Sequence, residues 1–288
     1  MIVEQSRNVH RITIDTNAKK EHWFLLTADH HWDNPDSDHE LIKKHLDEAK
    51  EKNAYVFMIG DWFCAMQGKY DKRSSKEKIR PEHQVNNYLD ALVNTAADFL
   101  EPYKDNIALI SQGNHETAIE KNHETNLIER LVERLNNGKR KIYAGGYGGY
   151  IRLNFRRGGS SKLPLNIKYF HGYGGGGPVT KGVIQSYRQS QFYPDADIVI
   201  SGHVHEQYTM CYMQERLKDD GRIVLKEQWH VRMPTYKDEY KDGHGGWHVE
   251  GGRPPKPIGA WWLKVVYDRY RKNNKEHFKL NYDFIKAK

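Results

Sequence analysis

The chain has 288 residues, of which 38% are hydrophobic and 29% are charged, a balance typical of folded globular proteins and not of disordered chains. No apolar run approaches the roughly 20 residues that a membrane helix needs, and the N-terminal stretch lacks the apolar core of a secretory signal. Two cysteines, Cys64 and Cys211, exclude a disulfide-rich framework, so we expect a cytoplasmic location. The formal net charge of +7 fits an anionic partner such as nucleic acid or a nucleotide, and equally a merely basic surface.

Five short apolar runs predict β-strands, and each run ends at a polar or glycine-containing cluster. In chain order the runs are Trp23–Ala28, Ala54–Ile59, Ile107–Ser111, Ile167–Phe170 and Asp197–Ser201. Helical periodicity is found near Asp38–Lys52, Gln84–Leu100 and Glu124–Asn136. The first half of the chain therefore alternates strand and helix, which favours an α/β sheet with crossover helices.

The last third of the chain is dominated by strand patterns. Tyr208–Arg216, Arg222–Arg232 and Ala260–Asp268 have strand character with few helices between them, which suggests antiparallel pairing. A mixed sheet, or two packed sheets with helices outside, accounts for both halves of the chain. The length and the absence of an internal repeat favour a single domain spanning residues 1–288.

Three segments fall outside these predicted elements. Residues 67–83 form a basic insertion, too polar for a core, and residues 235–257 form a Gly-, Pro- and His-rich loop that we interpret as a candidate lid. The third segment is the glycine run Gly172–Pro178. The insertion contains Lys69, Tyr70, Lys72, Arg73, Lys76, Lys78 and Arg80. Its cations could contact phosphates and its tyrosine could stack on a base, although such a loop is more often only solvated.

The polar clusters at the five strand ends have an unusual composition. They read Asp29-His30-His31, Gly60-Asp61, Gly113-Asn114-His115-Glu116, His171-Gly172 and Gly202-His203-Val204-His205. Because sites in α/β sheets gather beyond the carboxyl ends of strands, five neighbouring strands would direct these side chains into one crevice. Residues at positions i and i+2 leaving a strand point the same way, and the flanking glycines allow sharp turns and close approach. Imidazole, carboxylate and amide ligands without thiolate suit Mn, Fe, Zn or Ni and argue against a closed structural zinc site.

The ordered series D-x-H, GD, GNHE, H and GHxH resembles the calcineurin-like metallophosphoesterase family, over Asp29 to His205. Any one block alone would be weak evidence, but all five stand in order. The resemblance implies a four-layer α/β/β/α sandwich with two mixed sheets and a centre of two divalent transition-metal ions, with Mn as the first expectation. By analogy, one ion takes Asp29, His31, Asp61 and His205, and the other takes Asp61, Asn114, His171 and His203.

The implied chemistry is phosphoester hydrolysis by in-line attack of a hydroxide that bridges the two ions. Two divalent ions against Asp29, Asp61 and one hydroxide leave about one net positive charge, which attracts a phosphate ester. His115 is the candidate general acid, or a cation that binds the phosphoryl group; the alternative is that it only orients Asn114 or packs beneath the site. We interpret Glu116 as support for the ligands and His30 as structural. The histidines at positions 83, 244 and 248 are expected at the surface, the last two as candidate lid residues.

The second block departs from two branches of the family. Protein Ser/Thr phosphatases continue it as GD-x-x-DRG and nucleases of broken DNA ends as GD-x-F-D, whereas here Cys64 replaces the second acid and Ala65 the arginine. This departure argues against protein phosphatase activity and leaves open what orients His115.

Three hypotheses about function remain. The first, favoured by the positive charge, is a phosphodiesterase or nuclease acting on nucleic acid or nucleotides. The second is a phosphomonoesterase acting on a small metabolite or phosphopeptide. The third is a non-catalytic metal- or nucleic-acid-binding protein. The expected partner is an anionic phosphoester, without a membrane, and the sequence predicts no oligomeric state.

Overall fold

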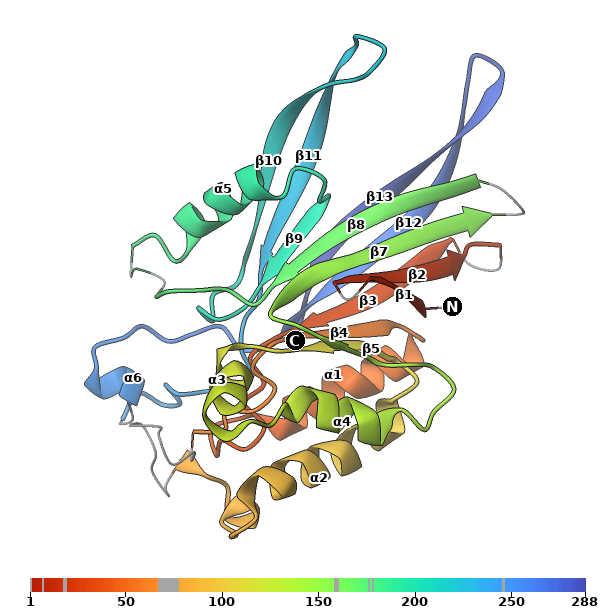
Figure 1. Cartoon of the computed structure of the whole chain (residues 1–288). Coiled ribbons are helices and arrows are strands. Elements are labelled where there is room, and N and C mark those ends of the chain that lie inside the picture. The colour runs from red at the N-terminus through yellow and green to blue at the C-terminus, as the bar shows by residue number, and fades with distance from the viewer. Residues whose placement is uncertain are drawn as a thin grey trace.

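Two mixed β-sheets pack face to face in the computed structural model, which describes residues 2–6, 8–17, 20–66, 78–157, 161–175, 177, 179–244 and 247–288 (Figure 1). The six-stranded sheet has the order β13-β12-β3-β4-β5-β6, and the seven-stranded sheet has the order β1-β2-β7-β8-β9-β11-β10. Each sheet contains both parallel and antiparallel pairs. The predicted α/β class with two mixed sheets is therefore confirmed.

The six-stranded sheet contains three of the five predicted strands. Its strands are β3 (Glu21–Thr27), β4 (Tyr55–Ile59), β5 (Ile107–Ser111), β6 (Tyr143–Gly145), β12 (Ala260–Lys272) and β13 (Lys275–Ala287). Strands β3 to β6 pair in parallel, so their carboxyl ends lie at one edge of the sheet. Strand β12 joins β3 in the antiparallel sense, as the sequence of the last third suggested.

The seven-stranded sheet contains the other two predicted strands. Its strands are β1 (Ile2–Ser6), β2 (Val9–Asp15), β7 (Gly148–Arg157), β8 (Ser161–Phe170), β9 (Ile198–Ser201), β10 (Tyr208–Leu217) and β11 (Ile223–Arg232). Strands β8 and β9 pair in parallel, so they too end side by side.

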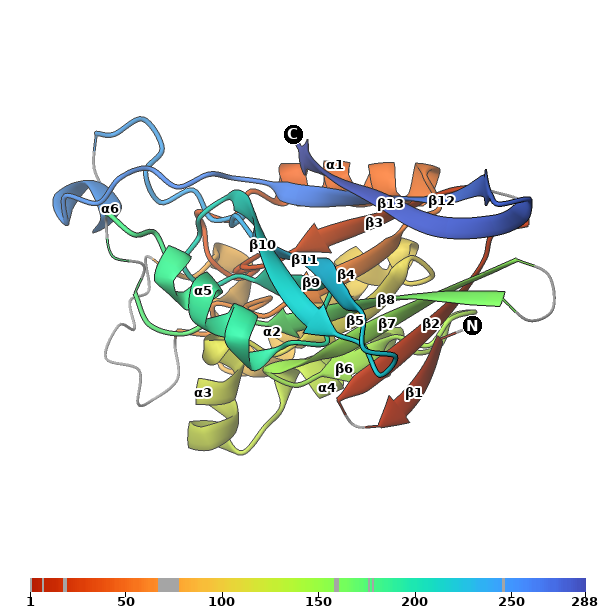
Figure 2. The same ribbon diagram turned by 90° about the horizontal axis from the view of Figure 1, so that it is seen from above.

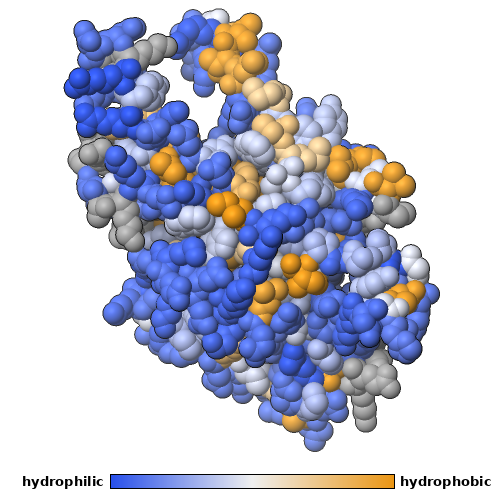
Figure 3. Space-filling view, turned by 180° about the vertical axis from the view of Figure 1, so that it is seen from behind, coloured by the Kyte–Doolittle hydropathy of each residue, from blue (hydrophilic) through white to orange (hydrophobic). Residues whose placement is uncertain are grey.

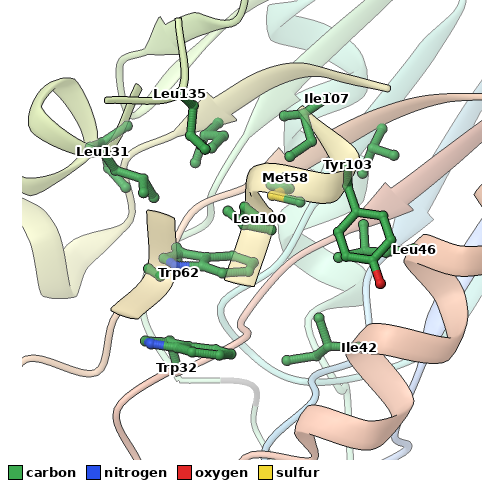
Figure 4. Close-up of a cluster of buried hydrophobic side chains, with 14 of the residues drawn as sticks. Trp32, Ile42, Leu46, Met58, Trp62, Leu100, Tyr103, Ile107, Leu131 and Leu135 are labelled. Atoms are coloured by element: carbon green, nitrogen blue, oxygen red, sulfur yellow. The ribbon is translucent and has the colours of Figure 1, made fainter. Parts of the chain in front are cut away.

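Alternating side chains divide the core into two layers. On β3, Phe24 and Leu26 pack between the sheets, whereas Leu25 faces the helices. On β4, Phe57 points between the sheets and Met58 points to the helices. Figure 4 shows the helix-side layer, where Met58 lies among side chains from several helices and loops. A strand buried on both faces explains why these runs are almost continuously apolar.

Helices form the outer layers. Helices α1 (His39–Glu51), α2 (Tyr88–Leu100) and α4 (Leu127–Leu135) cover the outer face of the six-stranded sheet (Figure 1). The Asp38 carboxylate accepts a hydrogen bond from the Leu41 backbone at 2.9 Å and so caps α1, and Asn126 caps α4 in the same way at 3.1 Å. Helix α5 (Val183–Phe192) lies on the opposite side, beside β9 and β10 (Figure 2), which completes the four layers.

Several elements differ from their predicted extents. Helix α2 begins at Tyr88 and not near Gln84, because a short 3₁₀ turn at Pro81–His83 precedes it. Helix α4 begins later than predicted, after the Asn126 cap. The sequence also gave no sign of α3 (Asn114–His123), α5, the short helix α6 (Trp247–Glu250) or the strands β1, β2, β7 and β13. Helix α3 buries only Glu116 and Ile119 and α5 exposes apolar residues, so neither has a clear apolar face.

The predicted basic insertion lies partly outside the described residues, which exclude 67–77 and with them Lys69, Tyr70, Lys72, Arg73 and Lys76. Its described end is not a solvated loop. Ile79 and His83 are buried, Lys78 pairs with Asp36 at 3.3 Å, and Arg80 donates hydrogen bonds to two backbone carbonyls. The prediction that this segment is too polar to pack was therefore wrong for residues 78–83.

Two hairpins extend beyond the body of the protein, β10–β11 and β12–β13 (Figure 1). Their ends differ in chemistry, as Figure 3 shows from behind. Leu217, Ile223 and Leu225 are exposed at the end of β10–β11, whereas the end of β12–β13 exposes Arg269 and Arg271. Within the described part of the chain, no helix is long and apolar enough to cross a membrane.

Truncation of Phe57 should test the packing between the two sheets. Phe57 is fully buried there, so Phe57→Ala should lower the free energy of unfolding by about 3–5 kcal/mol. Leu217→Ala, at the exposed end of β10–β11, should change it by no more than about 0.5 kcal/mol. Urea denaturation of both variants makes the comparison, and equal losses would contradict the layering.

Candidate metal centre

The five polar clusters meet at one edge of the molecule, but their strands belong to two sheets. Strands β3, β4 and β5 lie in one sheet and β8 and β9 in the other. The five strands that were expected to be neighbours are therefore divided between the two sheets. The crevice instead forms where the carboxyl ends of both sheets face each other, because the backbone of Asp29 bonds to Gly60 while its carboxylate bonds to the backbone of His203.

Five of the seven predicted ligands have left-handed backbone conformations. Asp29, His31, Asp61, His203 and His205 have φ between 49° and 73°. A left-handed backbone conformation costs roughly 1–3 kcal/mol of conformational free energy per residue, and it persists only where the surrounding structure enforces it. Of the predicted i, i+2 pairs, Asp29 and His31 converge in one ligand group through these sharp turns, whereas His203 and His205 fall in different groups.

Glycines make room for the ligand side chains. A Cβ atom on Gly113 would lie 2.1 Å from Asp61 Oδ1, and one on Gly202 would lie 2.3 Å from Asp29 Oδ2. Neither distance is compatible with a side chain, so the two carboxylates rest directly against glycine backbone. The prediction that glycines permit close approach at this site is confirmed at these positions.

Two groups of ligand atoms result. The first consists of Asp29, His31 and His205, whose ligand atoms all lie within 4.8 Å of one another. His31 Nε2 and His205 Nε2 are 3.4 Å apart, and His205 Nε2 is 3.3 Å from Asp29 Oδ1. Two imidazole nitrogens and a carboxylate oxygen facing one point form a donor set that a divalent cation would satisfy.

The second group consists of Asp61, His171 and His203, again within 4.8 Å. Asn114 joins it, because its side-chain oxygen is 2.8 Å from His203 Nδ1 and 3.2 Å from His171 Nε2. His171 Nε2 is 3.1 Å from Asp61 Oδ2 and 4.0 Å from Asp29 Oδ1, so the two groups adjoin. All seven predicted ligands therefore lie together in two adjoining groups, with Asp61 in the second group.

The buried charges of the second group favour a cation. Burial alone would raise the pKa of Asp61, but the imidazoles of His171 and His115 hold it well below its ordinary value. Burial would lower the pKa of His171, yet Asp61 and Asp29 raise it to about 9. A proton on His171 thus balances the carboxylates, and a bound divalent ion would displace that proton because a ligating imidazole must be neutral.

His115 is oriented by a backbone carbonyl. Its Nδ1–H donates to the Cys64 carbonyl oxygen at 2.5 Å, and its Nε2 lies 3.8 Å from Asp61 Oδ2. The tautomer that follows presents Nε2 to the two ligand groups. Cys64 stands where other branches of the family have the second acid, and its backbone carbonyl is what orients His115 here.

Asp33 holds that carbonyl in place. Its buried carboxylate accepts hydrogen bonds from the backbones of Cys64 and Ala65 at 2.6 and 2.9 Å and from the Tyr88 hydroxyl at 2.5 Å. Sequence reasoning missed Asp33, because it stands four residues after Asp29 and outside the five blocks. Its only sequence signal is an acid next to the D-x-H block.

The buried Cys64 thiol lies beside two of the histidines. Its sulfur and ring nitrogens of His31 and His115 lie within 4.8 Å of one another, and burial raises the pKa of the thiol to about 12.

Glu116 supports the turns that carry the ligands. Its carboxylate accepts backbone hydrogen bonds from Asp61, Gly113 and Phe63 at 3.2, 2.8 and 2.9 Å. Burial, with the nearby Asp61 charge, raises its pKa to about 8 against these three donors. Its position agrees with the interpretation as support for the ligands.

Two of the remaining histidines are not surface residues as predicted. His83 and His248 are buried, because His83 packs under α2 and bonds to Thr95 at 2.8 Å, and His248 pairs with Glu239 at 3.2 Å. His244 is exposed, as expected. His30 is buried and stacks on Tyr236 with ring centroids 4.9 Å apart, in agreement with a structural role.

The ends of the predicted lid belong to the framework of the centre. Thr235 Oγ1 and the Tyr236 backbone both donate to the Asp29 carbonyl, at 2.8 and 3.1 Å. At the other end, Lys256 Nζ donates to the Val204 carbonyl at 3.2 Å and pairs with Glu206 at 2.6 Å. The ends of this segment therefore brace the turns that follow β3 and β9, and a lid role for the residues between them stays a prediction.

A pocket of about 680 Å³ opens over the two ligand groups. His31, Asp61, Asn114, His115, His203 and His205 form its floor. Four cations of its wall are Lys78, Lys237, Arg253 and Lys256, and its wall also contains Glu239 and His248. The size suits a small ligand or the end of a larger one, and the lining favours an anion.

The sequence profile of the calcineurin-like phosphoesterases matches residues 22–207. The chain belongs to the calcineurin-like phosphoesterase family. The match begins in β3 and includes all seven candidate ligands, and the resemblance seen in the five blocks is thereby confirmed. Phosphoester hydrolysis and divalent metal binding are properties of this family.

Solved structures show only distant likeness. Vacuolar protein sorting 29 from Cryptosporidium parvum is 15% identical, with a TM-score of 0.39 over 92% of this chain and 99% of that one. GAP50, the anchor in the inner membrane complex of Plasmodium, is 13% identical, with a TM-score of 0.46 over 92% and 90%. The calcineurin-like phosphoesterase YfkN from Bacillus subtilis is 9% identical, with a TM-score of 0.36 over 91% and 90%. No curated protein matches the chain.

Substitution of Gly202 should separate metal binding from folding. The added Cβ in Gly202→Ala would meet the Asp29 carboxylate, so we expect at least a tenfold loss of Mn²⁺ affinity with little change in far-UV circular dichroism. Gly146→Ala is the control, because its Cβ would meet no atom within 4 Å. Isothermal titration with Mn²⁺ measures both, and parental affinity in Gly202→Ala would contradict the close approach.

Proposed function

We propose that this chain is a metal-dependent phosphodiesterase that acts on nucleic acid or nucleotides, with two divalent transition-metal ions, Mn²⁺ first among them. The observation that carries the proposal is the juxtaposition of two adjoining ligand groups with an oriented imidazole, beneath a pocket with cationic walls. When bound, the ions would lower the pKa of a water molecule and polarise the phosphoryl oxygens.

The seven ligand residues contribute different charges to the centre. Asp61 lies next to His171 of its own group, and by the family resemblance it would be the ligand shared by both ions. Asn114 contributes an oxygen without adding a charge. With two carboxylates among seven ligands, two divalent ions retain positive charge, which draws an ester phosphate to the centre.

His115 is placed to handle the leaving group. The Cys64 carbonyl holds its Nδ1–H, so Nε2 faces the centre and can carry a proton to the departing alkoxide. A non-catalytic binding protein would need no such oriented proton carrier, and this observation ranks that alternative last.

The pocket wall favours a diester over a monoester substrate. Cations come from three separate segments, at Lys78, at Lys237 and at Arg253 with Lys256. Spread charge of this kind suits a ligand with more than one anionic group, such as an oligonucleotide end or a nucleotide. A phosphomonoesterase acting on a small metabolite remains the second candidate, because the floor of the pocket would bind either ester.

A substrate panel with added Mn²⁺ tests the proposal. It contains bis-p-nitrophenyl phosphate, p-nitrophenyl phosphate, cyclic nucleotides and labelled linear DNA. We expect diester cleavage, which Asp61→Ala should abolish together with metal binding. His115→Ala should keep both metals and lose turnover by about 10²–10⁴-fold, most with poor leaving groups. His244→Ala, at an exposed position, serves as the control.

Two outcomes would contradict parts of this proposal. Monoester turnover without diester cleavage would favour the phosphomonoesterase. Parental turnover of a poor-leaving-group ester by His115→Ala would remove His115 from the chemistry.

A further inference from the structure

A buried chain of ion pairs lies in the pocket wall, outside the seven candidate ligands. Lys237 Nζ is 2.7 Å from Glu239 Oε1, and Glu239 Oε2 is 3.2 Å from His248 Nε2. The Lys237 residue is only 9% exposed, although it lines the pocket. The sequence placed these residues in a loop and suggested no role for the lysine or the glutamate.

Burial of the Lys237–Glu239 ion pair is energetically unfavourable. Moving an ammonium and a carboxylate out of water costs several kcal/mol per ion, and their attraction repays this only in part. An apolar pair would fill the same wall at lower cost. A lysine kept charged beside a candidate metal centre therefore points to an anionic ligand.

The backbone fixes Lys237 with respect to the centre. Its N–H donates to Thr235 Oγ1 at 3.0 Å, and it forms a β-bridge with Ser37. The preceding residues, Thr235 and Tyr236, both bond to the Asp29 carbonyl. Because two residues before Lys237 are bonded to the Asp29 carbonyl and Lys237 itself is bonded to Thr235 and bridged to Ser37, its backbone is held in place before a ligand arrives.

Lys237 and the candidate ligand His31 line the same pocket. Burial would lower the pKa of Lys237, but Cys64 and the ion pair with Glu239 raise it above its ordinary value. Lys237 is therefore a cation at neutral pH, close to the first ligand group.

We propose that Lys237 forms an anion-binding position beside the metal centre and donates hydrogen bonds to a non-bridging oxygen of a bound phosphoryl group. An ammonium has three N–H donors, and Glu239 is the acceptor paired with it in the described part of the chain. Glu239 holds the ammonium over the pocket, and His248 holds Glu239. This inference rests on the proposed function, because the phosphoryl group must lie at the centre.

The other lysines of the wall are placed differently. Lys256 is engaged by the Val204 carbonyl and by Glu206, so it braces the turn between His203 and His205. Lys78 is ion-paired with Asp36. Of these three lysines, Lys237 is the one whose ion-pair partner, Glu239, itself lines the pocket.

Phosphate binding to Mn²⁺-loaded protein tests the inference without turnover. Isothermal titration with inorganic phosphate compares the parent with Lys237→Met and Lys237→Arg. The loss of a charge-assisted hydrogen bond should weaken binding about tenfold to a hundredfold in Lys237→Met, and Lys237→Arg should recover part of it. Lys241→Met is the matched control, since Lys241 is 60% exposed and pairs with Asp36 at 2.8 Å. Metal content is measured for each protein.

The outcomes distinguish this inference from the proposed function. Parental phosphate affinity in metal-loaded Lys237→Met would overturn the inference and leave the function standing. Loss of metal in Lys237→Met would also overturn the inference, because it would show that Lys237 has a structural role. The absence of phosphate binding by the metal-loaded parent would overturn it as well. Weakened phosphate binding in the variant, with a parent that hydrolyses no ester, would support the anion position and refute the function.

Discussion

The structure depends on how Asp29 is held. Its backbone N–H bonds to the end of β4, its carboxylate accepts the His203 backbone from the end of β9, and its carbonyl accepts two donors from the segment at Thr235 and Tyr236. One residue thus links the edges of two separate sheets and the loop that lines the pocket. The two ligand groups adjoin at this connection, where His171 Nε2 of the second group is 4.0 Å from Asp29 Oδ1 of the first.

Strain and burial are concentrated at the same edge. Five candidate ligands have left-handed backbones, the two carboxylates rest against glycines, and an ion pair is buried in the pocket wall. Each of these features costs free energy, and the large apolar layers on both faces of the six-stranded sheet offset that cost. Unfavourable features concentrated at one place are the expected sign of a functional site. A divalent cation bound between Asp29, Asp61 and the imidazoles would offset the cost of burying these polar groups.

The sequence predicted most of the centre because its ligands are local in sequence at each strand end. Strand runs such as Ala54–Ile59 are apolar on both faces, so their ends could be recognised, and the residue types after them specify the chemistry. What could not be predicted depends on tertiary contacts. The division of the strands between two sheets, the role of Asp33 through the Cys64 main chain, and the burial of His248 and Lys237 follow from segments far apart in sequence. Backbone carbonyls have no sequence signature, so the orientation of His115 could not be inferred from its neighbours.

The central claim is that seven side chains from two sheets hold a pair of cations. Native mass spectrometry with elemental analysis of Mn²⁺-reconstituted protein tests it most directly, together with electron paramagnetic resonance for coupling between the ions. Two ions per chain with a coupled spectrum is the predicted result, because the two ligand groups adjoin, with His171 Nε2 4.0 Å from Asp29 Oδ1. A stoichiometry that never exceeds one ion, or two ions without coupling, would contradict the account.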